Sequence, residues 1–175
     1  MTQHSLLKQI LDAIWFILPA YVANGAPVIA SHIVRHRHPM DFGLKFIDGR
    51  RVFGDSKSWE GFLFGIALGT VVASLQYLFC GKPLLILRGF VLSVGALLGD
   101  CVGAFIKRRL GIPPGKPAPL LDQLSFLVVA IAFTSALNLC TLTAYQLLIL
   151  ILLTPILHVL ANTIAYLLGL KNVPW

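Results

Sequence analysis

The sequence predicts an all-α integral membrane protein with five transmembrane helices. Its 175 residues are 57% hydrophobic and only 12% charged, and the mean hydropathy of +0.84 is too high for a soluble domain. Five apolar stretches reach the roughly 20 residues that a helix needs to cross about 30 Å of hydrocarbon. We therefore expect a single transmembrane domain over residues 1–175, with helices at about 8–33, 59–80, 84–107, 120–140 and 144–169.

The distribution of basic residues predicts the orientation. Lys and Arg gather in the two loops at about 34–58 and 108–119, whereas the opposite face carries only Lys8, Lys82 and Arg88. By the positive-inside rule the crowded loops are cytoplasmic, which puts the N-terminus outside and the C-terminus inside. We expect a multi-pass protein of the cell membrane with its charged site facing the cytoplasm.

The first apolar stretch is expected to remain in the protein as a helix. It is longer than a signal peptide and follows no strongly basic segment. Asn24, between Ala23 and Gly25, is expected to unwind this helix near its inner half.

The second and third predicted helices each carry glycines at intervals of four. These are Gly61, Gly65 and Gly69 in the second helix and Gly95, Gly99 and Gly103 in the third. Small residues at this spacing form a smooth ridge that lets helix backbones approach closely in lipid. We expect this packing to bring Asp100 beside the start of the second helix, near Asp55, Lys57 and Glu60.

Asp100 is the most unusual residue of the third predicted helix. It lies seven residues before Lys107, on nearly the same helical face and about 10 Å away along the axis. A carboxylate two turns below the membrane rim is costly unless it meets protein, water or a cation, which makes Asp100 a functional candidate. The structural alternative is an ion pair or hydrogen bond to a neighbouring helix.

The fourth predicted helix begins after the linker GIPPGKPAP, which is too rich in proline to be helical. The linker carries Lys116 over the same rim. Asp122, in the first turn, is either a helix cap or a metal ligand. In the fifth predicted helix, His158 and Asn162 are expected to satisfy their hydrogen bonds within the bundle.

Carboxylates gather on the charged face together with the basic residues. They are Asp41, Asp48, Asp55, Glu60, Asp100 and Asp122. Acidic residues contribute little to orientation, so this mixture of charges indicates a site instead. Carboxylates favour a hard divalent cation such as Mg²⁺, and Lys and Arg would stabilise phosphoryl transfer by electrostatics and positioning. The chain contains no Walker motif, GxGxxG fingerprint or HExxH motif.

Three stretches resemble the CTP-dependent cytidylyltransferases that activate membrane lipid phosphates. They are FGDSKSWEGFLFG at 53–65, GDCVGAFIKRRLG at 99–111 and GKPAPLLDQLSF at 115–126. The first is similar to the KKTWEGF-type stretch of CDP-diacylglycerol synthases and the second to their GD…KR segment. DGRR at 48–51, YVANGAP at 21–27 and the APLLDQ ending resemble more closely the short archaeal branch, the CDP-archaeol synthases. Gln123 and Ser125 replace the Arg and the second Asp of the diacylglycerol branch, which favours the ether-lipid assignment.

The resemblance implies a reaction and a set of site residues. The phosphate of 2,3-di-O-geranylgeranylglyceryl phosphate would attack the α-phosphorus of CTP with Mg²⁺ and release pyrophosphate. Asp100 and Asp122 would hold the metal and, with Lys107, form the catalytic set. The expected substrate-binding residues are Lys57, Arg108 and Lys116 for the triphosphate, Ser56, Trp59 and Glu60 around the nucleotide, and Asp55, Arg50 and Asn24. The implied partners are CTP, an isoprenoid ether-lipid phosphate and membrane lipids, with no nucleic acid.

Three other functions remain open at this stage. A CDP-diacylglycerol synthase would use phosphatidate, and nothing in the sequence distinguishes ether from ester lipids. A small cation transporter could use Asp100 and the glycine ridges as a pathway, but the basic loops are poorly suited to attracting cations and no inverted repeat is visible. A non-catalytic lipid-binding scaffold would tolerate loss of Asp100 but not of the glycines.

Overall fold

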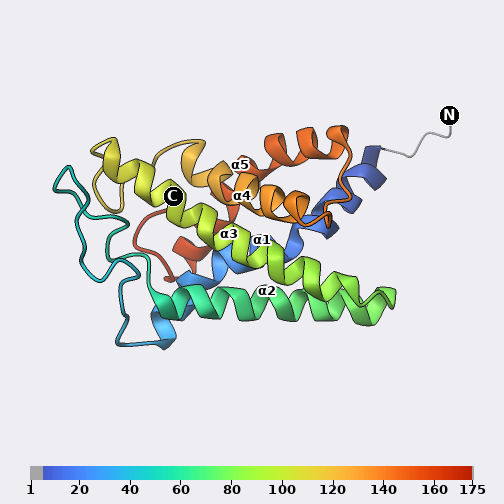
Figure 1. Ribbon diagram of the computed structural model, residues 1–175, viewed down its shortest axis with the longest axis horizontal. Helices are drawn as coiled ribbons and strands as arrows, with labels where there is room; N and C mark the ends of the chain where they lie inside the picture. The colour runs from blue at the N-terminus through green and yellow to red at the C-terminus, as the bar shows by residue number, and fades with distance from the viewer. Residues whose placement is uncertain (1–5, 175) are drawn as a thin grey trace.

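The protein is a bundle of five helices, which confirms the predicted all-α membrane fold. The computed structural model describes residues 6–174 (Figure 1). The helices in this range are α1 (Leu6–Ile33), α2 (Trp59–Cys80), α3 (Leu84–Arg109), α4 (Leu121–Ala136) and α5 (Ala144–Leu167). α1, α2, α3 and α5 are long and apolar enough to cross a membrane, and α4 is a shorter apolar helix.

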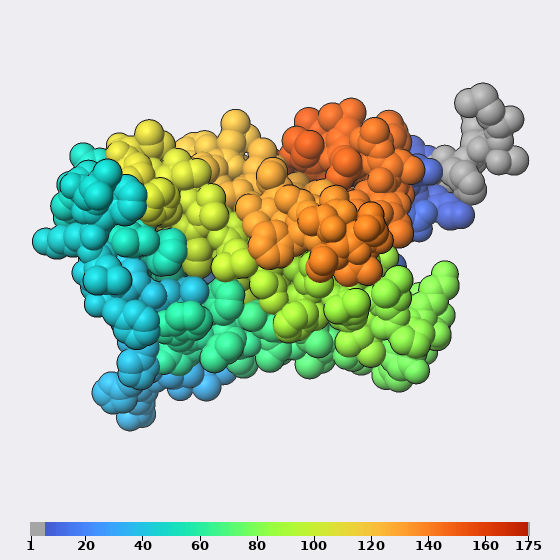
Figure 2. Space-filling model, viewed as in Figure 1, coloured from blue at the N-terminus to red at the C-terminus, as the bar shows by residue number. Residues whose placement is uncertain are grey.

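Successive helices run in opposite directions, so the connecting segments fall at two ends of the bundle (Figure 1). The loop 34–58, the linker 110–120 and the C-terminal segment lie together at one end, which we call the loop end. Segments 81–83 and 137–143 lie at the opposite end. Figure 2 shows the loop 34–58, in cyan, stacked against the yellow end of α3 and the linker. Because successive helices alternate in direction, the two basic segments and the C-terminal segment lie at the same end of the bundle. The cytoplasmic orientation of this end stays a prediction.

The fourth helix is shorter than the 120–140 span predicted from the sequence. α4 has 16 residues and is therefore about 24 Å long. It ends because Asn138 adopts a left-handed backbone conformation, with φ of 55°, and the N–H of Leu139 bonds to the carbonyl of Thr134 at 2.8 Å. This arrangement caps the last turn of a helix and turns the chain away from its axis. The apolar run that continues to Cys140 is thus loop, not helix.

The expectation that Asn24 unwinds the first helix is wrong. α1 is continuous from Leu6 to Ile33, although Pro19 and Pro27 lie inside it. Its small residues Ala23 and Ala26 are buried against neighbouring helices. Tertiary packing therefore keeps α1 helical where the local sequence disfavours a helix.

The glycine ridges do bring helices into close contact, but not all with the expected partner. A Cβ added at Gly65 of α2 would lie 2.7 Å from the Ala23 carbonyl oxygen of α1. A Cβ added at Gly99 of α3 would lie 2.5 Å from the Ser125 carbonyl oxygen of α4. The ridge of α3 therefore packs on α4, and α3 reaches α2 with its other side. Lys57 is placed beside Asp100, as expected, by this central position of α3.

The apolar core joins four of the helices at mid-height. It consists of Ala13, Phe16, Ile17 and Ala20 of α1, Leu92 and Ala96 of α3, Phe126, Leu127 and Ala130 of α4, and Leu150 of α5. A partly buried hydrogen bond of 2.7 Å between the hydroxyls of Tyr21 and Thr154 adds a polar link from α1 to α5. These contacts fix the helix ends from which the charged side chains project.

The close approach of α3 and α4 predicts a difference between two glycine-to-alanine substitutions. Gly99→Ala should lower the free energy of unfolding by about 1–3 kcal/mol, because the new methyl group meets backbone atoms that cannot move aside. Gly25→Ala is the control, since an added Cβ there meets no atom within 4 Å. Thermal unfolding in detergent measures both, and equal stability of the two variants would contradict the packing described.

Candidate active site

A polar cavity of about 360 Å³ opens at the loop end of the bundle. We call it the carboxylate cavity, because Asp100 of α3 and Asp122 of α4 both line it. Seven of the residues predicted from the sequence meet here: Asn24, Ser56, Lys57, Asp100, Lys107, Lys116 and Asp122. They come from α1, the loop 34–58, α3, the linker and α4, so the cavity exists only in the assembled bundle.

Asp100 pairs with Lys57 across the junction of α2 and α3. The Lys57 Nζ donates to Asp100 Oδ2 at 2.5 Å. The backbone around Lys57 is held in place: its carbonyl accepts from the N–H of Met40 at 2.8 Å, and the next residue, Ser58, is the N-cap of α2. Lys57 therefore reaches Asp100 from the fixed end of a helix.

Asp122 pairs with Lys107 in the same cavity. The Lys107 Nζ donates to both carboxylate oxygens, at 2.8 and 2.9 Å, and the N–H of Ala118 donates to Asp122 Oδ2 at 2.8 Å. Asp122 lies one residue inside α4, whose N-cap is Leu120. The capping alternative is therefore wrong, because this carboxylate binds Lys107 and the linker instead of the free N–H groups of its own helix.

Asp41 organises the loop 34–58, a role that the sequence did not reveal. Its carboxylate, 1% exposed, accepts five hydrogen bonds: Arg51 Nη2 at 2.6 Å and Nε at 3.2 Å, and the backbone N–H groups of Gly54, Phe53 and Gly43 at 2.9, 3.0 and 3.1 Å. Burial raises the pKa of Asp41, but the bonds from Arg51 and the backbone outweigh it and hold the pKa well below its usual range.

Two arginines attach the tip of this loop to the end of α3. Arg50 donates from Nη1 to the carbonyls of Arg108 and Arg109, at 3.1 and 2.8 Å. Arg109 in turn donates to Asp48 Oδ1 at 2.8 Å and to the Arg51 carbonyl at 2.6 Å. The last carbonyls of α3 are thereby satisfied by a cation, which also suits the negative end of the helix dipole. Arg50, which was predicted to bind substrate, thus binds the carbonyls at the end of α3 in this structure.

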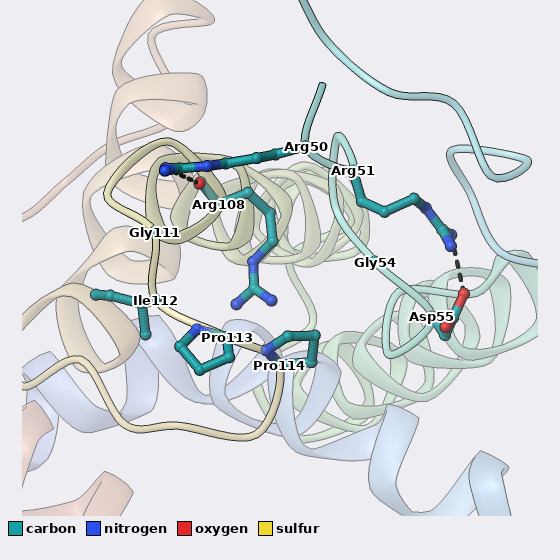
Figure 3. Close-up of a pocket in the computed structure, with 9 residues that line it drawn as sticks. All are labelled: Arg50, Arg51, Gly54, Asp55, Arg108, Gly111, Ile112, Pro113 and Pro114. Carbon is teal, nitrogen blue, oxygen red and sulfur yellow. Dashed lines mark hydrogen bonds and ion pairs between the residues drawn. The ribbon is translucent and has the colours of Figure 1, made fainter. Parts of the chain in front are cut away.

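A second cavity of about 360 Å³ lies behind Arg108, and we call it the arginine cavity. Arg50, Arg51 and Asp55 of the loop and Pro113 and Pro114 of the linker also line it. Figure 3 shows the Arg108 guanidinium pointing into this space, with Asp55 held to one side by Arg51. Arg108 is 8% exposed, and within the described part of the chain its Nε and Nη1 atoms have no hydrogen-bond partner. Buried donors of this kind are ready to bind an anion.

A narrow pocket of about 60 Å³ joins the two cavities. It shares Lys57, Asp100, Lys107 and Asp122 with the carboxylate cavity, and Arg108 and Pro114 with the arginine cavity. The three adjoining spaces, which we call the path, are lined by both Lys–Asp pairs and by Arg108. Such a path can accommodate an extended polyanion.

Trp59 and Glu60 line neither cavity. Glu60 accepts from the backbone N–H of His38 at 2.9 Å and contacts His38 Nδ1 at 2.5 Å. The Trp59 ring packs against Phe42 and Phe62, with centroid distances of 6.5 and 6.0 Å. In this structure both residues fasten the loop 34–58 to the start of α2.

Three residues at the end of the chain were missed as site candidates. His158, Asn162 and Lys171 line the carboxylate cavity together with the Lys–Asp pairs. His158 and Asn162 form hydrogen bonds within the bundle, as expected: they contact each other at 3.3 Å, and Lys171 Nζ donates to Asn162 Oδ1 at 3.0 Å. The spacing of four between His158 and Asn162 puts them on one helical face, which was the available signal. Burial lowers the pKa of Lys171, which follows α5.

The donor set of the carboxylate cavity fits a magnesium ion that is shared with a phosphate ligand. Among residues 6–174, no three His, Cys, Asp or Glu side chains gather as a metal cluster. Mg²⁺, however, is usually held by one or two carboxylates together with substrate phosphates and water. Asp100 and Asp122 supply two carboxylates on one cavity, and each has a lysine that can transfer to a phosphate.

Comparison with known proteins gives a consistent result. The family described as CarS-like CDP-archaeol synthase matches residues 6–175. The CDP-archaeol synthases of Pyrococcus abyssi and Thermococcus gammatolerans are each 47% identical over 174 residues, which cover 97% of this chain and 100% and 98% of theirs. A solved structure of an intramembrane enzyme for archaeal membrane lipids biosynthesis is 44% identical with a TM-score of 0.80, covering 87% of this chain and 94% of its own.

The buried carboxylate of Asp41 predicts how the loop 34–58 responds to mutation and pH. Asp41→Asn should lower the free energy of local opening by about 1–3 kcal/mol, because Arg51 loses its buried charge partner. Since the pKa of folded Asp41 lies below its unfolded value of about 3.9, its contribution is complete above that pH and is lost as the pH falls towards the folded pKa.

Hydrogen exchange at the amides of Phe53 and Gly54 measures this opening. The control is Asp48→Asn, which removes a more exposed ion pair and should change the opening free energy by less than about 1 kcal/mol. Equal exchange in the two variants would refute the organising role of Asp41.

Proposed function

Because the chain belongs to the CDP-archaeol synthase family, and is therefore a membrane-embedded cytidylyltransferase, we propose that it transfers CMP from CTP to 2,3-di-O-geranylgeranylglyceryl phosphate. The products are CDP-archaeol and pyrophosphate. The reaction takes place at the loop end of the bundle, in the cytoplasm-facing half of the membrane.

The observation that carries the proposal is the pair of Lys–Asp contacts in one cavity. Lys57 with Asp100 and Lys107 with Asp122 put two cations and two carboxylates around one space. A nucleoside triphosphate and a divalent metal need this combination, because the lysines can neutralise phosphate oxygens while the carboxylates bind the metal. A cation pathway would have no use for the lysines.

The roles of the side chains follow from their places along the path. Asp100 and Asp122 would hold Mg²⁺, and Lys57 and Lys107 would move from these carboxylates to the phosphate oxygens of CTP. The β- and γ-phosphates extend through the connecting pocket to Arg108, whose free donors face the arginine cavity. Ser56, Lys116 and Asn24 line the remaining wall and contact the substrates.

Bound Mg²⁺ would supply charge neutralisation at the reacting phosphates. An oxygen of the lipid phosphate attacks the α-phosphorus of CTP, a new P–O–P bond forms, and the bond to the β-phosphate oxygen breaks. Pyrophosphate leaves with the bonding electron pair, towards Arg108. The lipid phosphate is largely ionised at neutral pH, because its second pKa is near 6, so this step needs no general base.

Replacing Asp100 tests the proposed reaction. Purified protein in detergent with CTP and Mg²⁺ should release pyrophosphate with the geranylgeranyl ether lipid, and Asp100→Asn should lower kcat by about a hundredfold or more. The matched control is Asp12→Asn, which removes an exposed carboxylate of α1 outside the cavity and should keep full activity. Turnover with phosphatidate alone would reassign the lipid, and absence of turnover with both lipids would refute the proposal.

Substituting each residue of the Lys107–Asp122 pair in turn should distinguish metal binding from nucleotide binding. Asp122→Asn should raise the Mg²⁺ concentration for half-maximal rate by about tenfold or more, because one of two carboxylates is lost. Lys107→Met should instead raise the KM for CTP, with less change in the Mg²⁺ requirement. Metal titrations of both variants measure this, and an unchanged Mg²⁺ requirement in Asp122→Asn would exclude Asp122 as a ligand.

A further inference from the structure

A polar cluster from the C-terminal part of the chain, His158, Asn162 and Lys171, lines the same carboxylate cavity as the two Lys–Asp pairs. The chain reverses after α5 because Gly169 has a φ of +72° and the N–H of Leu170 bonds to the Ala165 carbonyl at 2.8 Å. This reversal directs Lys171 back to Asn162, to which its Nζ donates at 3.0 Å. The cavity thus has, in Lys171, a further cation that is not among the predicted triphosphate ligands.

An apolar groove of about 320 Å³ adjoins this wall. It lies between α1 and α5, with Leu68 of α2 at its edge. Small residues make the space: Gly25 and Ala26 on α1, and Ala161 and Ala165 on α5. A side chain added at Gly25 would meet no atom within 4 Å, so the groove is open at this point.

The groove and the carboxylate cavity are neighbours that share part of their lining. Val28 of α1, Asn162 of α5 and Leu170 of the C-terminal segment line both. Asn162 therefore lies at the boundary between the carboxylate cavity, which is lined by lysines, and the apolar groove between the membrane-spanning helices.

We propose that this junction binds the lipid substrate, with its phosphate held by Lys171 and Asn162 and one of its isoprenoid chains lying in the groove between α1 and α5. The identity of the lipid rests on the proposed function. CTP has no apolar part to fill the groove, whereas a lipid phosphate has both the anion for Lys171 and the chain for the apolar space.

The arrangement also solves the problem of bringing an insoluble acceptor to a soluble nucleotide. The chains stay in an apolar environment between two helices while the phosphate enters the cavity at Asn162 and Lys171. Two phosphate groups then meet in one cavity, each neutralised by its own cations. This positioning favours attack without requiring the lipid to leave the membrane.

Two variants test the two halves of the junction. Gly25→Leu should fill the groove and raise the KM for the geranylgeranyl lipid by about tenfold, without raising the KM for a phosphate with chains too short to enter it. Lys171→Gln should raise the KM for both lipids by about tenfold, because it removes a charge-assisted contact. Both variants should leave the KM for CTP unchanged. Ala132→Leu, on the exposed face of α4, is the matched control and should change none of these values.

Equilibrium binding of the geranylgeranyl lipid phosphate without CTP, compared with the corresponding alcohol, separates this inference from the proposed reaction. Weaker binding of the phosphate to both variants supports the junction even if wild-type protein releases no pyrophosphate, which would refute only the proposed reaction. Unchanged lipid binding and KM in Gly25→Leu and in a second filling variant, Ala165→Leu, would overturn the groove. A rise in the KM for CTP alone in Lys171→Gln would assign this lysine to the nucleotide instead.

Discussion

The need to neutralise two carboxylates at the membrane rim determines much of this structure. Asp100 and Asp122 project from helices whose neighbours are apolar, where an unpaired charge is strongly unfavourable. Each meets a lysine from a different part of the chain, at 2.5 Å for Asp100 and 2.8 Å for Asp122. These pairs require α2, α3 and α4 to begin or end at nearly the same height, and the glycine contacts of α2 and α3 with their neighbours make the close approach possible.

The loop 34–58 also depends on the neutralisation of carboxylates by cations. It carries Lys57, so its position decides whether Asp100 has a partner. A loop of this length would be mobile without internal order. Asp41 supplies that order from within through five hydrogen bonds, while Arg50 and Arg109 fasten the loop to the last carbonyls of α3. Arg50 and Arg109, which hold the loop, thus lie in the same two basic stretches of the sequence as Lys57 and Arg108, which line the proposed path.

The two Lys–Asp pairs also indicate how the proposed substrate would bind. In the structure, each of the two lysines is held by a carboxylate that would otherwise be a bare charge. Under the proposed function, a triphosphate with its metal would replace both kinds of contact, since the phosphate oxygens would bind the lysines and the metal would bind the carboxylates. Binding would then exchange one set of charged contacts for another, which keeps the desolvation cost low.

The sequence by itself determined the membrane class and the approximate spans, because long apolar runs leave few alternatives, and it singled out Asp100 as an isolated charge within one of them. The family resemblance of its motifs added Lys57, Lys107 and Asp122 as candidates. The sequence also placed Asp100 next to Lys57. Local signals failed where packing decided: α1 stays helical across Asn24, α4 stops at Ala136, and Asp122 binds Lys107 instead of capping its helix. Only the tertiary structure brought Lys171, Asn162 and His158 to the cavity and gave Asp41 its role. These residues depend on chain reversals and long-range contacts that no periodicity in the sequence reports.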